Sequence, residues 1–375
     1  MSKVIMVGCD LHDRNMLLRY SAGKGKPRQY ACANDAEGRV KMIDHLQAFA
    51  KSEGAERIVF VYEASGQGYG LCDLLHDNGI ECHVLSPTHL PKTAKRAKQK
   101  TDPKDAQMLL DQVRGFVLAG TELPVVWTPP KRLRDDRELV RARIDAADET
   151  TRVKFQILSL LKRRGIVLPR WHGKYWSKRF LHWLHQTATE LDAAVTPVLE
   201  GLIDRYELCK RQLGSLDKAL FKLANTDRYQ GPCQELLKLA GVGLLSAMTF
   251  LTEMGDLTRF RNRREVAAYL GLCPASFESG KNDDRKGRIT KQGPHRLRKM
   301  LCQAAWASLR YCEETSKKYH RIKAGKKNRT KKALVAVMRQ LAIKMWHRAL
   351  ACGVDVQLLG RGGPHDLPAP CESDG

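Results

Sequence analysis

The sequence lacks several features that mark common classes of protein. No apolar run approaches the roughly 18 residues that a membrane-spanning helix needs, so we expect no partnership with a membrane interior. The first residues turn polar and acidic too early for a secretory signal peptide. No GxxxxGKS/T loop, the motif that binds the phosphates of ATP in many enzymes, is present. We therefore expect chemistry that does not need ATP.

Cysteine is present, but its pattern argues against its usual structural uses. The 11 cysteines are odd in number, form no CxxC pair and lie mostly inside apolar stretches. A disulfide framework or a structural zinc site would need paired or clustered ligands. We expect small buried thiols in a protein of the reducing cytoplasm.

Aromatic residues are few, at 7% of the chain, whereas basic residues are in large excess. The 65 Lys and Arg against 41 Asp and Glu give a formal net charge of +24. Such an excess repels itself unless a polyanion balances it, so nucleic acid is the leading partner and an anionic membrane surface the second. Since few aromatics are available to stack on single-stranded bases, duplex recognition through phosphates fits better.

The first third of the chain has the pattern of an α/β domain. Apolar, β-branched or alternating runs predict strands, and periods of three and four residues with helix-ending signals predict helices. The strands are expected at 4–10, 15–21, 28–33, 57–63 and 81–86, and the helices at 35–52, 69–78 and 104–115. This order of elements is that of a ribonuclease-H-like fold.

The rest of the chain is predicted to be helical. Apolar residues between 199 and 223 alternate at spacings of three and four, which is typical of a coiled-coil seam. A helical hairpin within one chain and a coiled coil between chains fit this seam equally well. We predict a ribonuclease-H-fold domain at 1–125, a helical coiled-coil domain at 126–230, a mostly α-helical domain at 231–350 and a flexible tail at 351–375.

Four acids stand where these elements would bring them together. Asp10 and Glu63 end the first and fourth strands, which are neighbours in a ribonuclease-H-like sheet. Asp102 and Asp105 flank the start of a helix one turn apart, on the same side. Because such a cluster repels itself without cations, we expect Mg²⁺, which takes carboxylate oxygens and shares its other positions with phosphate. Two such ions can stabilise the attacking and leaving oxygens of a displacement.

Two neighbours of the first acid, His12 and Asp13, are given only a supporting role. Their residue types suit the site, but position in the sequence alone does not show which way they point.

A polar loop in the C-terminal half combines a hydroxyl with cations. Ser279 precedes Gly280, and a hydroxyl framed by positive charge can attack a phosphodiester. Ser276 is an equally plausible hydroxyl on this evidence. No acid interrupts the seven bases that follow, which are Arg285, Lys286, Arg288, Lys291, Arg296, Arg298 and Lys299.

Two further basic runs are expected to bind phosphates without reading sequence. The first leads directly into Asp102, and the second spans 317–332 with nine Lys and Arg and no acid. Their members include Lys95, Arg96, Lys98 and Lys100 in the first run and Lys326, Lys327 and Arg329 in the second.

Taken together, these residues resemble a known family. Asp10, Glu63, Asp102 and Asp105 are similar to the four acids of the DEDD insertion-sequence transposases of the one-ten family, which includes the Piv-type DNA invertases. The segment SGK…GRITKQG…LR…L at 279–301 resembles the hallmark of their C-terminal transposase domain. The resemblance covers nearly the whole chain.

The resemblance implies a RuvC-like N-terminal domain, a coiled-coil insertion and a C-terminal domain with a nucleophilic serine, which Ser279 fits best. Glu278 stands where the family commonly has a second serine, and Ser276 remains the alternative nucleophile. The resemblance also implies a structured guide RNA that pairs donor and target double-stranded DNA, in the nucleoid of a bacterial cytoplasm. Because the two motifs lie on separate domains, we expect a site shared between the subunits of a dimer or tetramer.

The resulting hypothesis is recombination by cutting and rejoining DNA. Magnesium ions on the four acids would activate the scissile phosphate, and Ser279 would attack it to leave a phosphoserine link and a free 3′ hydroxyl. Two alternatives stay open: a metal-dependent nuclease of the Holliday-junction type that forms no covalent intermediate, and a DNA- or RNA-binding protein without catalysis.

Overall fold

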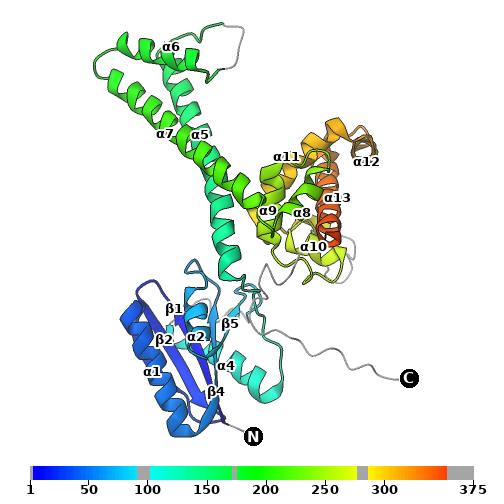
Figure 1. Ribbon diagram of the computed structural model, residues 1–375. Helices are drawn as coiled ribbons and strands as arrows, with labels where there is room; N and C mark the ends of the chain where they lie inside the picture. The colour runs from blue at the N-terminus through cyan, green and yellow to red at the C-terminus, as the bar shows by residue number, and fades with distance from the viewer. Residues whose placement is uncertain (1–2, 91–101, 171–174, 277–285, 353–375) are drawn as a thin grey trace. The chain divides into compact units, whose positions relative to one another are not determined.

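The computed structural model describes residues 3–90, 102–170, 175–276 and 286–352 (Figure 1). The chain divides into two compact units, Met1–Thr128 and Pro129–Gly375, and each is described by itself. All ten cysteines within these ranges are free. No described helix is both long enough and apolar enough to cross a bilayer.

The first unit is built on a mixed five-stranded sheet with the order β3-β2-β1-β4-β5. Strand β2 is antiparallel to β1 and β3, whereas β4 and β5 run parallel to β1. This topology confirms the predicted ribonuclease-H-like fold. Its elements are β1 (Lys3–Leu11), β2 (Asn15–Ala22), β3 (Arg28–Ala33), α1 (Ala36–Glu53), β4 (Ala55–Glu63), α2 (Gly70–Asp77), β5 (Glu81–Leu85) and α4 (Asp102–Ala119).

Strand alternation divides the core of this unit into two layers. One layer contains Val7 and Tyr62 with residues of α1 and α2, and the other contains Met6 and Val61 with residues of α4. Side chains two residues apart on a strand share a face. Asp10 is therefore in phase with Met6, and Glu63 with Val61, on the face that α4 covers.

Helix α4 lies against β1 at Gly8, with no room for a side chain between them. A Cβ on Gly8 would lie 2.2 Å from the backbone nitrogen of Leu110 and 2.6 Å from the carbonyl oxygen of Ala106. Only glycine allows two backbones to approach so closely. This contact fixes the height of α4 above the sheet, two residues before Asp10.

The second unit is largely helical, as predicted for this part of the chain. Its elements are α5 (Lys131–Arg163), α6 (Lys178–Thr189), α7 (Thr196–Ala224), α8 (Gln230–Leu237), α9 (Leu244–Met254), α10 (Arg263–Tyr269), β6 (Pro274–Ser276), β7 (Lys286–Ile289), α11 (His295–Tyr311), α12 (Glu313–Lys323), η1 (Lys327–Arg329) and α13 (Thr330–Ala351). Figure 1 shows α5 and α7 side by side, with α6 at the far end of the pair.

The seam predicted on α7 packs within the chain. Leu199, Tyr206 and Cys209 are buried against α5 residues that include Val153 and Ile157. The ion pairs Arg143–Asp217 and Arg205–Glu149 show that the two helices run antiparallel, because the earlier residue of α5 meets the later residue of α7. Of the two readings of the seam, the structure contains the hairpin within one chain.

The remaining helices, α8 to α13, form a bundle at the open end of the hairpin (Figure 1). Its apolar centre includes Met248 and Phe250 of α9, Leu301 of α11 and Met345 of α13, all of which are buried. The Trp346 indole of α13 donates to the carbonyl of Leu257 over 3.0 Å, so even its polar atom is satisfied in the bundle.

Candidate active site

Asp10, His12 and Asp102 converge at the end of the first strand. The Nε2 atom of His12 lies 3.1 Å from Oδ2 of Asp10 and 3.6 Å from Oδ1 of Asp102. One possible ligand atom from each residue lies within 4.8 Å of the other two. Strand β1 supplies Asp10, the turn after it supplies His12, and the first residue of α4 supplies Asp102.

The two other predicted acids lie beside this group. Asp105 is half-buried one turn further along α4, and its charge reaches Asp10. Glu63 is exposed at the end of β4, one residue after the pair Cys9–Tyr62, which makes it the neighbour of Asp10 across the sheet. Neither belongs to the group of three ligand atoms within 4.8 Å.

The electrostatics of Asp10 favour a cation. Burial raises the pKa of this carboxyl above its ordinary value, and the charges of Asp105 and Asp102 raise it further. The charge of His12 and its hydrogen bond act in the opposite direction. Because a raised pKa means that the negative form is disfavoured, a bound cation would relieve the cost of keeping Asp10 ionised.

The donor set fits a divalent metal ion. Carboxylate oxygens from Asp10 and Asp102 are the ligands that Mg²⁺ prefers, and the exposed side of the cluster leaves room for water or phosphate. His12, which was expected to have only a supporting role, contributes its imidazole to the group of three. His12 follows Asp10 by two residues, in the turn after β1, and this nearness in the sequence is the signal that points to it.

Polar side chains join the loops that follow β1 and β4. The amide of Gln67 donates to Asp13 over 2.9 Å, and the amide of Asn34 donates to Gln67 and to the carbonyl of His12, both over 2.7 Å. Arg39 in turn donates to the Asn34 side-chain oxygen over 2.9 Å. Asp13, given a supporting role above, thus holds the loop after Glu63.

The proposed nucleophile cannot be placed, because Ser279 lies outside the described residues. The same holds for Lys95, Arg96, Lys98, Lys100 and Arg285. The backbones of Ser276 and Lys286 pair across the β6–β7 ribbon, on either side of that segment.

Three of the cations that follow are engaged within their own unit. Arg296 pairs with Asp145 of α5 at 2.8 Å, and Lys299 pairs with Asp148 at 2.5 Å. Arg298 donates to carbonyl oxygens at the turn that precedes α11, including that of Gln292 at 2.6 Å. These contacts stabilise the bundle, and they occupy N–H donors that could otherwise bind phosphate.

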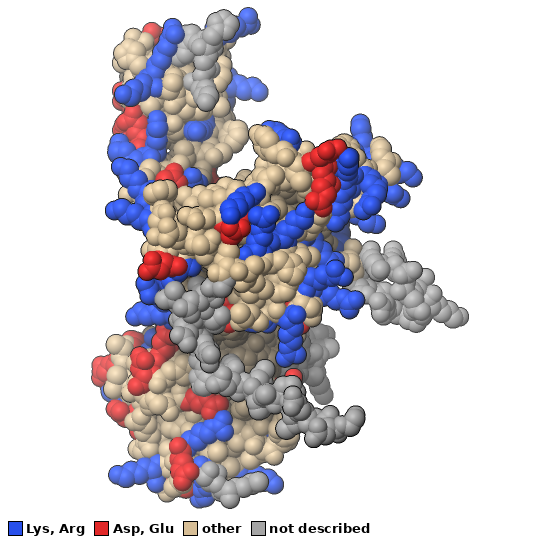
Figure 2. All heavy atoms as spheres, turned by 45° about the vertical axis from the view of Figure 1, so that its right-hand side comes forward, with Lys and Arg blue, Asp and Glu red and all other residues tan. Residues whose placement is uncertain are grey.

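Other predicted cations are open to solvent. Arg288 and Lys291 are exposed on and just after β7. The exposed run on α12, η1 and the start of α13 includes Lys326, Lys327 and Arg329. Figure 2 shows Lys and Arg side chains, in blue, gathered at the upper right of the face in view.

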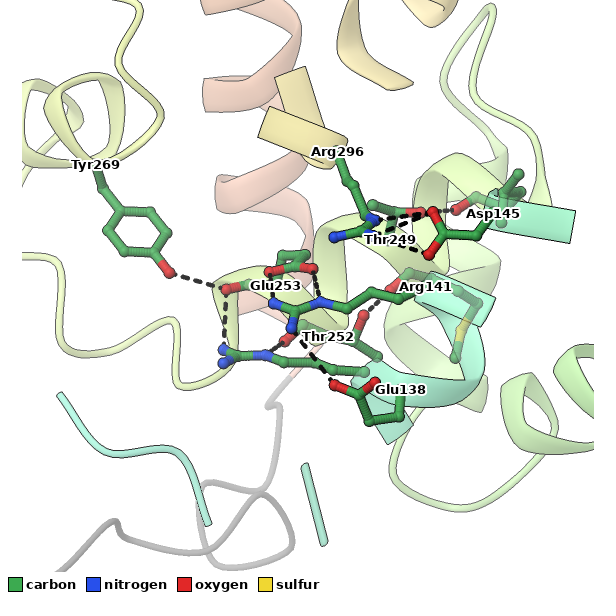
Figure 3. A network of polar contacts seen from close by, with 11 residues as sticks. Glu138, Arg141, Asp145, Thr249, Thr252, Glu253, Tyr269 and Arg296 are labelled. Atoms are coloured by element: carbon green, nitrogen blue, oxygen red, sulfur yellow. Dashed lines mark hydrogen bonds and ion pairs between the residues drawn. The ribbon is translucent and has the colours of Figure 1, made fainter. Parts of the chain in front are cut away.

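A buried ionic network joins α5 to the bundle (Figure 3). The guanidinium of Arg141 donates to both carboxylate oxygens of Glu253, at 2.8 and 3.0 Å, and Glu253 is only 4% exposed. Arg137 donates to the carbonyls of Thr252 and Glu253, and Tyr269 donates to the Glu253 carbonyl over 3.1 Å. All these groups have partners inside the unit, so we assign the network to structure.

A ribonuclease-H-like sheet with acids at the ends of its two neighbouring parallel strands defines a nuclease-type domain of the DEDD class. Two family models match the chain accordingly. Residues 7–165 match the DEDD transposase model named for IS110, and residues 233–321 match the model described as Transposase IS116/IS110/IS902 family. The chain belongs to the IS110 family of insertion-sequence transposases.

Relatives with transposase names agree with this membership. The protein y4qE of Sinorhizobium fredii is 33% identical over 261 residues, which are 67% of this chain and 58% of that protein. The transposase for insertion sequence element IS1533 of Leptospira borgpetersenii is 25% identical, over 82% of this chain and 86% of the relative. The transposase for IS1111A of Coxiella burnetii is 26% identical, over 72% and 71%. The chain thus spans less than two thirds of the length of y4qE, and more than two thirds of the length of each of the other two relatives.

Proposed function

We propose that this chain is a DNA transposase that cuts and rejoins strands through a covalent phosphoserine intermediate. The observation that carries the proposal is the convergence of Asp10, His12 and Asp102 at one end of a DEDD-family sheet. Asp10 and Asp102, with Glu63 and Asp105 beside them, would hold Mg²⁺. When bound, the ions would supply positive charge to the non-bridging oxygens of a scissile phosphate.

The chain's own residues would do the rest of the chemistry. The Ser279 Oγ attacks phosphorus and loses its proton, and the 3′ oxygen of the cleaved strand leaves and takes one up. The phosphate ester is exchanged rather than hydrolysed, so its bond energy is kept for rejoining by a 3′ hydroxyl of the partner strand. Ser276 remains the alternative nucleophile.

The partners follow from charge and family. The net charge of +24 and the exposed cations Lys326, Lys327 and Arg329 support binding of duplex DNA through its phosphates. We also propose a structured guide RNA and a dimer or tetramer, on the strength of the family resemblance. Sequencing the nucleic acid that copurifies with the full chain tests the first of these, and an absence of any one enriched RNA would contradict it.

Cleavage of end-labelled donor DNA tests the proposed chemistry. With Mg²⁺, the protein should form a protease-sensitive adduct on DNA, and Ser279→Ala should abolish it while DNA binding persists. Ser276→Ala is the matched control and should keep the adduct. Asp102→Asn should lose cleavage but not binding.

The rival functions predict different results. Cleavage that persists in Ser279→Ala without any adduct would favour a junction nuclease that uses water. Full cleavage by Asp102→Asn would show that this acid is not catalytic. An absence of cleavage by the parent protein, with nucleic-acid binding that Asp102→Asn leaves unchanged, would support a protein that only binds nucleic acid.

A further inference from the structure

The imidazole of His12 lies between two carboxylates of the candidate metal site, although histidine is not one of the four DEDD acids. Its Nε2 atom faces both Asp10 and Asp102, at 3.1 and 3.6 Å. The His12 side chain is 45% exposed, so it could turn to solvent at little cost. Instead it completes the cluster, where the two remaining DEDD acids do not supply the third atom.

The backbone of His12 is fixed by contacts that do not involve its ring. Its N–H donates to the carbonyl of Asn15 over 3.0 Å, and its own carbonyl accepts from the amide of Asn34 over 2.7 Å. Asn34 is itself oriented by hydrogen bonds with Gln67 and Arg39. The turn is therefore built to hold the histidine at the strand end, whether or not the ring is paired with the acids.

We propose that His12 is a third ligand of the metal ion at this site, so that the site binds Mn²⁺ more tightly than Mg²⁺. The inference rests on the proposed function, since it concerns the same ion. Mg²⁺ strongly prefers oxygen donors, whereas imidazole nitrogen favours transition-metal ions. A set of two carboxylates and one imidazole therefore discriminates between two ions that four carboxylates would treat more equally.

Asn34 is the positioning residue in this arrangement. Its side chain hydrogen-bonds with the carbonyl of His12 and the side chains of Gln67 and Arg39, and none of these partner atoms is a candidate ligand atom of the cluster. Removing its amide should let the turn move and weaken the nitrogen contact without changing the carboxylates. Asn34→Ala should therefore shift metal preference in the same direction as loss of His12, and by less.

Metal binding by the full chain without nucleic acid tests the proposal. Mn²⁺ affinity is measured by electron paramagnetic resonance, and Mg²⁺ affinity by its competition with Mn²⁺, at one mildly alkaline pH. In His12→Ala, the ratio of Mn²⁺ to Mg²⁺ affinity should fall about tenfold, the scale on which one group near a metal alters affinity. The modulation of the Mn²⁺ spin echo by a directly bound ¹⁴N should appear in the parent protein and vanish in the variant.

A histidine outside the cluster provides the control. His185 is exposed on α6 in the second unit, and His185→Ala should change neither the ratio nor the nitrogen signal. His12→Gln, which keeps a polar side chain in the turn, guards against a local folding defect and should also lose the nitrogen signal.

The outcomes separate this inference from the proposed function. An unchanged ratio in His12→Ala, together with no ¹⁴N signal in the parent, would overturn the ligand role and leave the carboxylate site intact. If Asp10→Asn and Asp102→Asn bind both ions as the parent does, the metal site itself is misplaced and the proposed function fails.

Discussion

The α-carbon of Gly8 lies directly under the backbone of Leu110, so that a Cβ would come within 2.2 Å of the Leu110 nitrogen. The clashing atoms belong to the backbone of α4, which no rotamer change can move. Gly8→Ala must therefore displace the helix that carries Asp102 and Asp105. We expect a loss of about 3 kcal/mol in stability of the first unit, at the upper end of overpacking costs.

Hydrogen exchange of amides in β1 and α4 measures this loss, and Mn²⁺ affinity should weaken with it. Gly70→Ala is the matched control, since a Cβ there meets nothing within 4 Å at the start of α2. If these amides are equally protected from hydrogen exchange in Gly8→Ala and in the parent, the contact between β1 and α4 is looser than the structure indicates.

Arg141 neutralises a buried acid in the second unit. Arg141→Met leaves the Glu253 carboxylate, which is 4% exposed, without its guanidinium. We expect a loss of about 3 kcal/mol, because an unpaired buried charge is costly. The double variant with Glu253→Leu should recover most of it, since no charge then remains to be paired.

Urea unfolding followed by tryptophan fluorescence reads this effect. Of the six tryptophans only Trp127 lies outside Pro129–Gly375, so the signal reports mainly on the second unit. Arg152→Met, which breaks an exposed pair with Glu149, is the control and should cost well under 1 kcal/mol. A double variant as unstable as the single one would contradict the argument.

The stability of the first unit should depend on acid through Glu81. Burial works to raise the pKa of this carboxyl, but hydrogen bonds from His83 and Arg57 outweigh it and lower the pKa to about 2. A lowered pKa means that the stabilisation is complete above the ordinary value of 4.5 and is lost as the pH falls toward 2. Glu81→Gln should cost about 1 kcal/mol at neutral pH, the upper range for a partly exposed pair.

Thermal unfolding of parent and variant across this pH range checks the sign. The difference between the two should shrink as the pH falls from 4.5 toward 2. Glu37→Gln, which breaks the exposed pair with Lys41 on α1, should show a difference of only about 0.3 kcal/mol. A Glu81→Gln difference that stays constant with pH would indicate that packing, not charge, is lost.

The exposed cations of the C-terminal run should govern the salt dependence of DNA binding. Replacing Lys326, Lys327 and Arg329 together by Gln removes up to three phosphate contacts. The plot of log affinity against log salt has a negative slope. The magnitude of this slope should decrease by about 3, close to one for each contact removed. Binding of unrelated duplexes by fluorescence anisotropy measures it.

Three exposed cations of α7, Lys210, Arg211 and Lys218, provide a set of equal charge for comparison. If both triple variants change the slope equally, net charge rather than this surface controls binding.

Much of the fold was predictable because its signals are local. Val4–Asp10 is a short apolar run with β-branched residues, which is typical of a buried strand. Asp35 caps the start of α1, because its side chain accepts a hydrogen bond from the backbone N–H of Gly38. The ends of β1 and β4 could be paired in advance, because the order of elements is that of a ribonuclease-H-like fold, in which the first and fourth strands are neighbours. Metal occupancy and the role of Ser279 remain predictions.

What the sequence by itself determined is therefore the order of elements and the residue types at the strand ends. Only the tertiary structure decided that His12 completes the group with Asp10 and Asp102, because that depends on the height of α4 above Gly8 and on the turn that Asn34 holds. It also decided that Arg296 and Lys299 pair with acids of α5, more than a hundred residues away. Such pairings depend on distances in space, which sequence spacing does not encode.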